Sequence, residues 1–194
     1  MMQPLAVPIQ QKYVIAAGLI LVALLAAYQL LGVAQLTRPA LTPQEMATTP
    51  VDVESTTDDA QLDDHLWLRL SAQVDGDAAL AEMPDDVRAY YVTRAFEWEW
   101  GSGGITGVLM SASEVGPYVA DGYRRLGLTQ EAEMFDQMWS SPALQTMLAG
   151  FNADPDYEPS EDDVVDLDEL SAAIGQHDDV RIQFVRQRPE IFSV

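Results

Sequence analysis

The pattern of apolar and polar positions divides the chain into an apolar N-terminal segment, a polar stretch and a long region with helical periodicity. Residues 13–36 contain no charged side chain over 24 positions and are flanked by Lys12 and Arg38. As a helix this segment would be about 36 Å long, enough to cross a hydrocarbon core of about 30 Å. The pattern therefore predicts a single transmembrane anchor, preceded by an N-terminal tail of residues 1–12.

Two other interpretations of residues 13–36 stay open. A cleaved secretory signal would explain the preceding lysine and the small residues Gly32 and Ala34 near the end of the segment. The uncharged run is longer than the roughly 7–15 residues usual for a signal core, which favours an uncleaved anchor. The third interpretation is a buried helix of a soluble protein, but such helices rarely reach this length without a polar face.

The charges beside the anchor indicate its orientation. Lys12 and the α-amino group precede the segment, and Arg38 alone follows it before the acidic residues begin. Because basic residues concentrate on the cytoplasmic side, we expect a single-pass inner-membrane protein with its N-terminus inside and its large domain outside. One lysine is set against one arginine, so the reverse orientation stays open.

The region after the anchor predicts a linker and one helical domain. Residues 37–59 contain three prolines, six threonines and few large apolar side chains, a composition typical of a flexible linker. Residues 60–194 have the length of one domain. Leu62, Leu66 and Leu70 recur at helical spacing, and period-two alternation is nearly absent throughout. We therefore expect an all-α, compact multi-helix domain.

Capping signals and apolar spacing place the individual helices. The Gly-Ser-Gly-Gly sequence at 101–104 predicts a break between a helix that begins near Pro84 and a short helix over 105–110. Aromatic side chains at helical spacing are expected in the core: Trp67, Tyr91, Phe96, Trp98 and Trp139. The other expected boundaries are starts at 57–59, Thr129 and Ser141, an end at Gly127, helices over about 167–174 and 178–187, and a stop at Pro189.

The charge of the domain is extreme. All 31 acidic residues follow Arg38, together with eight arginines and no lysine, so residues 39–194 carry a formal charge of −23. Such a surface argues against direct nucleic-acid binding and favours a protein partner with a basic surface. Acidity that serves solubility or suits a saline habitat is the alternative explanation. The absence of cysteine excludes disulfides, cysteine–zinc sites and a thiol nucleophile.

No motif typical of catalysis or of a cofactor is present, so we expect no enzyme activity and no catalytic, cofactor-binding or metal-binding residues. Asp154, Asp156 and Glu158 have the spacing of a calcium loop, but Pro159 stands where that loop requires glycine. Weak calcium binding by residues 154–169 remains the alternative for an exported domain.

The titratable residues outside that stretch are expected to be structural. His65 and His177 lie beside acids without a metal-ligand pattern, so both are expected at the surface. Glu97 and Glu99 are two positions apart and diverge on a helix. An enzyme would require the fold to bring Glu99, Arg94 and a histidine together.

Three segments together resemble a known family. They read YYVTRAFEWEWGSGGITGVLM at 90–110, VADGYRRLGL at 119–128 and VRIQFVRQRPEIF at 180–192. Over about residues 60–194 the chain resembles the C-terminal domain family of the bacterial DNA-mimic protein, a group mostly of unknown function. The resemblance implies an all-α domain that can form a homodimer and whose acidic surface imitates DNA phosphates for a DNA-binding protein.

The chain departs from that family in the turn at 101–104, where Gly-Ser replaces the usual Asn-Asn, and at Gly107 and Ser111, where an amide side chain is usual. No site residue is therefore carried over from the family. DNA mimicry also requires a cytoplasmic domain, which conflicts with the expected orientation. The sequence thus predicts a membrane-anchored, acidic, helical protein-binding module without catalytic activity.

Overall fold

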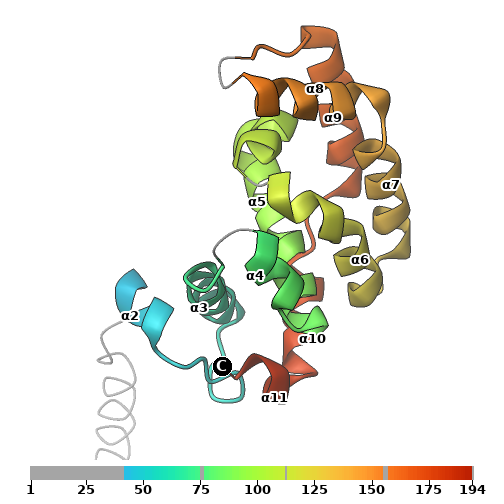
Figure 1. Cartoon of the computed structure of the whole chain (residues 1–194). Helices are drawn as coiled ribbons and strands as arrows, with labels where there is room; N and C mark the ends of the chain where they lie inside the picture. The colour runs from blue at the N-terminus through green and yellow to red at the C-terminus, as the bar shows by residue number, and fades with distance from the viewer. Residues whose placement is uncertain (1–41, 75–76, 112, 155–156, 194) are drawn as a thin grey trace, which may run out of the picture. The chain divides into compact units, whose positions relative to one another are not determined.

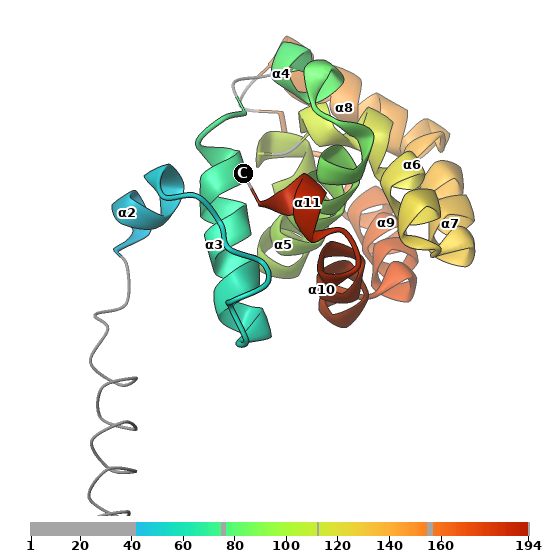
Figure 2. The ribbon, with the colours of Figure 1, turned by 90° about the horizontal axis from the view of Figure 1, so that it is seen from below.

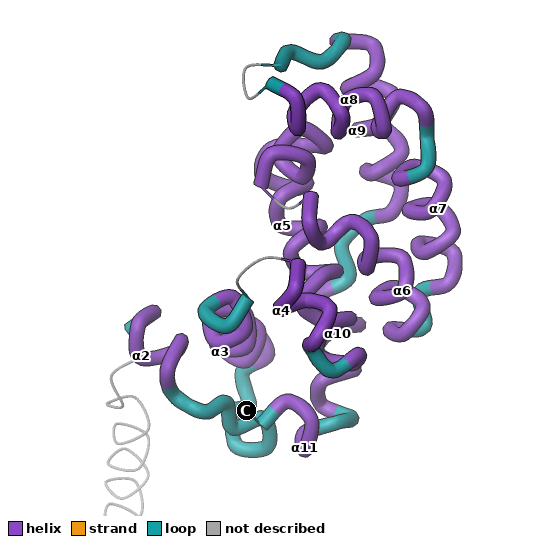
Figure 3. Tube along the Cα trace, in the orientation of Figure 1, coloured by secondary structure: helices purple, strands orange, loops and turns teal. Residues whose placement is uncertain are grey.

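The computed structural model describes residues 42–74, 77–111, 113–154 and 157–193, and every regular element within them is a helix (Figures 1 and 3). The prediction of an all-α domain is confirmed. The chain divides into two compact units, residues 1–42 and 43–194, and the second holds all of these helices. They are α2 (Pro43–Thr48), α3 (Asp59–Ser71), α4 (Asp77–Glu82), α5 (Asp85–Ser111), the 3-10 turn η1 (Ser113–Val115), α6 (Gly116–Leu126), α7 (Thr129–Trp139), α8 (Pro142–Ala153), α9 (Glu161–Ile174), α10 (Asp178–Arg186) and α11 (Pro189–Phe192).

The predicted transmembrane anchor at residues 13–36 lies outside the described residues, as does the N-terminal tail. Among the helices that the structure describes, none combines the length and the apolar character needed to span a bilayer. The anchor, its orientation and the membrane localisation therefore stay predictions.

The folded domain begins earlier than predicted. α2 packs against α3, and Val51 and Val53 are buried in the core at 2 % and 1 % exposure. The ring nitrogen Nε2 of His65 lies 3.1 Å from the carbonyl oxygen of Thr49 and ties this segment to α3. Residues 43–53, which the sequence assigned to the flexible linker, are thus packed against the domain, because two valines bury the apolar surface that the rest of the segment lacks.

The start of α3 follows the predicted capping chemistry. The Asp58 carboxylate accepts a hydrogen bond of 3.1 Å from the backbone N–H of Gln61. Leu62, Leu66 and Leu70 then form the buried stripe that their four-residue spacing predicted.

α5 is the central helix, and it is interrupted at one glycine. Within the Gly-Ser-Gly-Gly sequence only Gly104 leaves the helical conformation, with φ 61° and ψ −161°. A carboxylate oxygen of Asp168, in α9, accepts a hydrogen bond of 2.7 Å from the backbone N–H of Ile105 and caps the second half of α5. The predicted break is thereby confirmed at one residue, and the predicted short helix follows it.

Two of the later helix boundaries match the predicted signals and two differ. Gly127 ends α6 with φ 85°, and Ser141 accepts the backbone N–H three residues on at 3.3 Å. Leu128 rather than Thr129 occupies the position before α7. Pro189 begins α11 instead of ending the chain's helices, because proline fits the first turn, where its missing N–H needs no partner.

The C-terminal helices close the core. α10 contacts α3, α5 and α6, and Figure 2 shows it beside α5. Phe192 of α11 is fully buried, with its ring centroid 6.0 Å from that of Tyr90 and 6.1 Å from that of Phe184. This closure brings the start of α10 against the middle of α5, where the buried polar groups of the domain gather.

Candidate functional site

The most buried charged groups of the domain are Glu97 of α5 and Arg181 of α10, which are 2 % and 1 % exposed. The Nη1 group of Arg181 donates to Oε2 of Glu97 at 2.5 Å. Arg181 also pairs through Nη2 with Asp178, one turn earlier in α10. Burial lowers the pKa of Arg181, but the charge and the hydrogen bond of Glu97 outweigh it, so the pKa is raised overall. The guanidinium therefore stays charged inside the protein.

Two further residues complete what we call the Glu97 cluster: Glu97, Tyr123, His177 and Arg181. The Tyr123 hydroxyl donates to Oε1 of Glu97 at 3.0 Å, and the backbone N–H of His177 donates to Oε2 at 3.0 Å. The His177 ring nitrogen Nδ1 lies 3.2 Å from Oε1. One carboxylate thus joins α5, α6 and the start of α10. Its oxygens have the hydrogen-bond donors and the opposite charge that a buried carboxylate requires.

A second polar group lies between α3 and α5. Oδ1 of Asp63 accepts a hydrogen bond of 2.7 Å from the Tyr90 hydroxyl, and Oδ2 accepts one of 2.7 Å from Nε of Arg94. The Arg94 guanidinium lies 4.8 Å from the ring centroid of Trp67 and 5.6 Å from that of Trp98. Arg94 thus makes cation–π contacts with both tryptophans.

A groove opens beside these two groups, between α3 and α10. It consists of two adjoining pockets of about 360 Å³ and 200 Å³, which share Asp63 and Asp178 and which we together call the acidic groove. The larger pocket is lined by Asp59, Ala60, Asp63, Asp64, Asp178, Asp179 and Ile182, and the smaller by Asp63, Arg94, Glu97, Trp98, Gln176, Asp178 and Arg181. Carboxylates outnumber arginines in this lining, so the groove attracts cationic groups.

Several expectations about individual residues are corrected by this geometry. His65 is 8 % exposed and the His177 side chain 15 %, so neither is the surface residue that the sequence predicted. Trp98 was expected in the core but is 58 % exposed, because it covers the Arg94 guanidinium instead. The carboxylate beside a histidine is Glu97 and not Glu99, as these side chains diverge on α5.

Sequence reasoning did not find the Glu97 cluster. A signal was present, since Tyr90, Arg94 and Glu97 follow one another at helical spacing on the buried face of α5. The residues that pair with Glu97 lie 26 to 84 positions away, so no local motif marks them.

The two buried phenols give a test of this arrangement. Burial and the neighbouring carboxylates raise the pKa of Tyr90, beside Asp63, and of Tyr123, beside Glu97, well above the ordinary value of a phenol. The folded state thus holds both protons more tightly than the unfolded state, so the free energy of unfolding should fall as the pH rises above about 10.

Ultraviolet titration of the phenolates in the full-length chain measures this directly. We expect two phenols to ionise only as the domain unfolds, and Tyr90→Phe and Tyr123→Phe each to remove one of them. Titration of all tyrosines together in the folded protein would contradict the buried positions.

In the described ranges, no group of three or more histidines and acids could hold a metal ion. Asp156 of the proposed calcium stretch lies outside those ranges.

The model of the DMP19-like protein family matches residues 81–188 of the chain, more than half of its length. The chain belongs to the DMP19-like protein family. No curated protein matches it, and no solved structure does.

The match to the DMP19-like family covers α5 to α10 and so includes Glu97, Trp98 and Arg181. The α3 side of the acidic groove, with Asp63 and Asp64, precedes the matched residues. The family resemblance drawn from the sequence is therefore confirmed, while the homodimer that it implied stays a prediction.

Proposed function

We propose that this chain is an acidic, helical protein-binding module without catalytic activity, anchored in a membrane by residues 13–36, and that its partner has a basic surface. The observation that carries the proposal is that the arginines are bonded within the domain. Each of the eight arginines after residue 38 is bonded to an acceptor within the domain. The positive charges are thus held in internal contacts, while many carboxylates face solvent unpaired.

Seven of these arginines pair with carboxylates, and Arg69 bonds to a backbone carbonyl instead. Three of them line a third pocket, of about 390 Å³, between α5 and α6: Arg88, Arg124 and Arg125. Arg88 pairs with Asp85 at 2.6 Å, and Arg125 pairs with Asp85 at 3.2 Å and also with Asp86. This pocket therefore adds no free cation to the surface.

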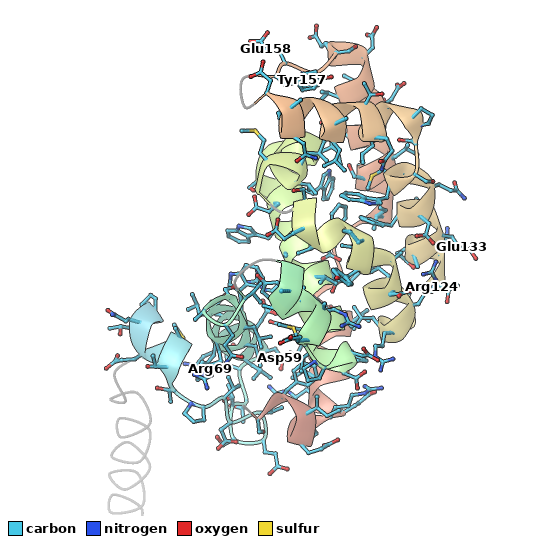
Figure 4. The ribbon with its side chains drawn as sticks, viewed as in Figure 1. Asp59, Arg69, Arg124, Glu133, Tyr157 and Glu158 are labelled. Carbon is cyan, nitrogen blue, oxygen red and sulfur yellow. The ribbon has the colours of Figure 1, made fainter. Side chains whose placement is uncertain are left out.

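Exposed carboxylates without an ion pair to any described residue are spread over the other elements. Figure 4 labels two of them, Glu133 on α7 and Glu158 after α8. These exposed carboxylates include Glu54, Glu82, Glu133, Glu158, Glu161, Asp162, Asp166, Glu169, Asp179 and Glu190. A surface of this kind repels other acidic molecules and accelerates association with a basic one.

The resemblance to the bacterial DNA-mimic protein supports the same class of partner, namely a protein that binds DNA phosphates. That version of the function requires the domain to face the cytoplasm. A reporter fused after Val194 that is active on only one side of the membrane would decide between the two orientations.

Capture of binding proteins at two salt concentrations tests the proposed function. We expect the full-length chain to retain proteins at about 50 mM salt and to release them at about 500 mM, because screening shortens the range of the carboxylate field. A variant with Glu161→Gln, Asp162→Asn, Asp166→Asn and Glu169→Gln should retain less. A partner that stays bound at high salt, or no partner at low salt, would contradict the electrostatic proposal.

A further inference from the structure

We infer that the acidic groove between α3 and α10 binds an arginine or lysine side chain of the protein partner, next to the indole of Trp98. The inference rests on the proposed function and names the part of the acidic surface that makes the specific contact. It follows from three features of the groove: its exposed carboxylates, its exposed indole and a buried donor without an acceptor.

Exposed carboxylates lie on both sides of the groove, and one of them, Asp179, has no ion pair to a described residue. On α3, the Asp64 side chain is 68 % exposed and its nearest cation, Nη2 of Arg94, is 3.6 Å away. On α10, Asp179 is exposed and pairs with no described residue. Asp59, Asp63 and Asp178 are already paired with arginines. Asp64 and Asp179 therefore have the capacity to bind an incoming cation.

The exposed indole lies in the smaller pocket of the same groove. Trp98 is 58 % exposed, although large apolar side chains are normally buried. It already contacts the Arg94 guanidinium. The face of an indole attracts cations, so the exposed part of Trp98 can contact a second guanidinium or ammonium group.

The buried donor belongs to Arg181, a residue that lines the smaller pocket. The Nε–H of Arg181 is buried and has no hydrogen-bond partner within the part of the chain that the structure describes. A buried donor left unpaired is costly, and it requires an acceptor such as a carbonyl oxygen. A simple cation provides no acceptor, whereas a polypeptide provides a basic side chain and a backbone carbonyl together. These two requirements favour a basic peptide segment over a metal ion or a small amine.

Nuclear magnetic resonance on the full-length chain in a non-ionic detergent tests the inference. The probe is the capped peptide acetyl-Gly-Arg-Gly-amide, and its control is the same peptide with the uncharged analogue citrulline in place of arginine. We expect the arginine peptide to shift the indole N–H signal of Trp98 and the Nε–H signal of Arg181 with one common midpoint, and the citrulline peptide to shift neither. Shifts elsewhere with Trp98 unmoved would overturn the inference.

Variants then locate the binding energy. Trp98→Ala should weaken peptide binding by about fivefold, and Trp98→Phe by less, because a phenyl face still attracts a cation. Asp64→Asn with Asp179→Asn should weaken it by about tenfold. The matched control is Asp162→Asn with Asp166→Asn, which removes the same charge from the exposed face of α9 and should change affinity by less than about twofold.

Circular dichroism shows whether each variant is folded, so that weaker binding is not mistaken for unfolding. Equal weakening by the α9 control and the groove variants would contradict the groove as the binding place. It would leave the proposed function standing if capture remains salt-dependent. Failure of the salt-dependent capture itself would instead contradict the proposed function, whatever the groove binds.

Discussion

Replacing Glu97 by alanine is expected to lower the free energy of unfolding by about 3–5 kcal/mol, the cost typical of breaking a buried ion pair by removing one partner. The substitution would leave the Arg181 guanidinium, 1 % exposed, without its buried carboxylate. It would also remove the acceptor of the Tyr123 hydroxyl and of the His177 backbone N–H. Urea denaturation of the full-length chain, followed by circular dichroism, measures the loss.

Glu99→Ala is the matched control, since Glu99 lies two residues along the same helix and is only partly buried. The Glu99 side chain forms no ion pair with a described residue. We therefore expect its removal to change the free energy of unfolding by no more than about 0.5 kcal/mol. Similar losses for the two variants would mean that the Glu97 cluster does not hold the helices together.

Gly104→Ala is expected to cost about 2–3 kcal/mol, since it combines backbone strain with the loss of a helix cap. Its φ of 61° favours glycine, and an added Cβ would lie 2.7 Å from Oδ1 of Asp168. Asp168 would then have to move away from the Ile105 N–H that it caps. Urea denaturation again provides the measurement.

Gly103→Ala tests the same turn without the strain. No atom lies within 4 Å of a Cβ built at Gly103, and its φ is not positive. We expect this variant to be neutral or to gain up to about 1 kcal/mol, because alanine restricts the unfolded chain more than glycine does. A loss as large as that of Gly104→Ala would contradict the assignment of the break to Gly104.

The helices of this domain could be predicted from sequence because their signals are local. Asp58 and Ser141 cap helices within three residues of themselves, and Gly127 terminates one by its own conformation. The apolar stripe of α3 repeats every turn, so its buried face follows from spacing alone.

The buried polar groups could not be predicted in the same way, because their environment comes from other helices. His177 is mostly covered where it lies beside Glu97, which is 80 positions earlier in the chain, and nothing next to it in sequence indicates this. Trp98 is of a residue type normally found in the core, but its ring covers the charged guanidinium of Arg94. Val51 and Val53 are buried, although they lie in a proline- and threonine-rich stretch whose average composition is typical of a linker.

The closure of the domain by its last helices also bears on how it folds during synthesis. Arg186 donates to the carbonyl oxygen of Val53 at 2.6 Å, a contact between positions 133 residues apart, and Phe192 packs on Tyr90. Contacts so distant in sequence form slowly and late. Until α10 and α11 have been translated, the Val53 carbonyl lacks its Arg186 donor and the Tyr90 ring lacks its contact with Phe192. The nascent chain then exposes apolar surface on which chaperones act. Completion of this core therefore depends on the synthesis of α10 and α11, and a truncation that removes these two helices would leave the core open.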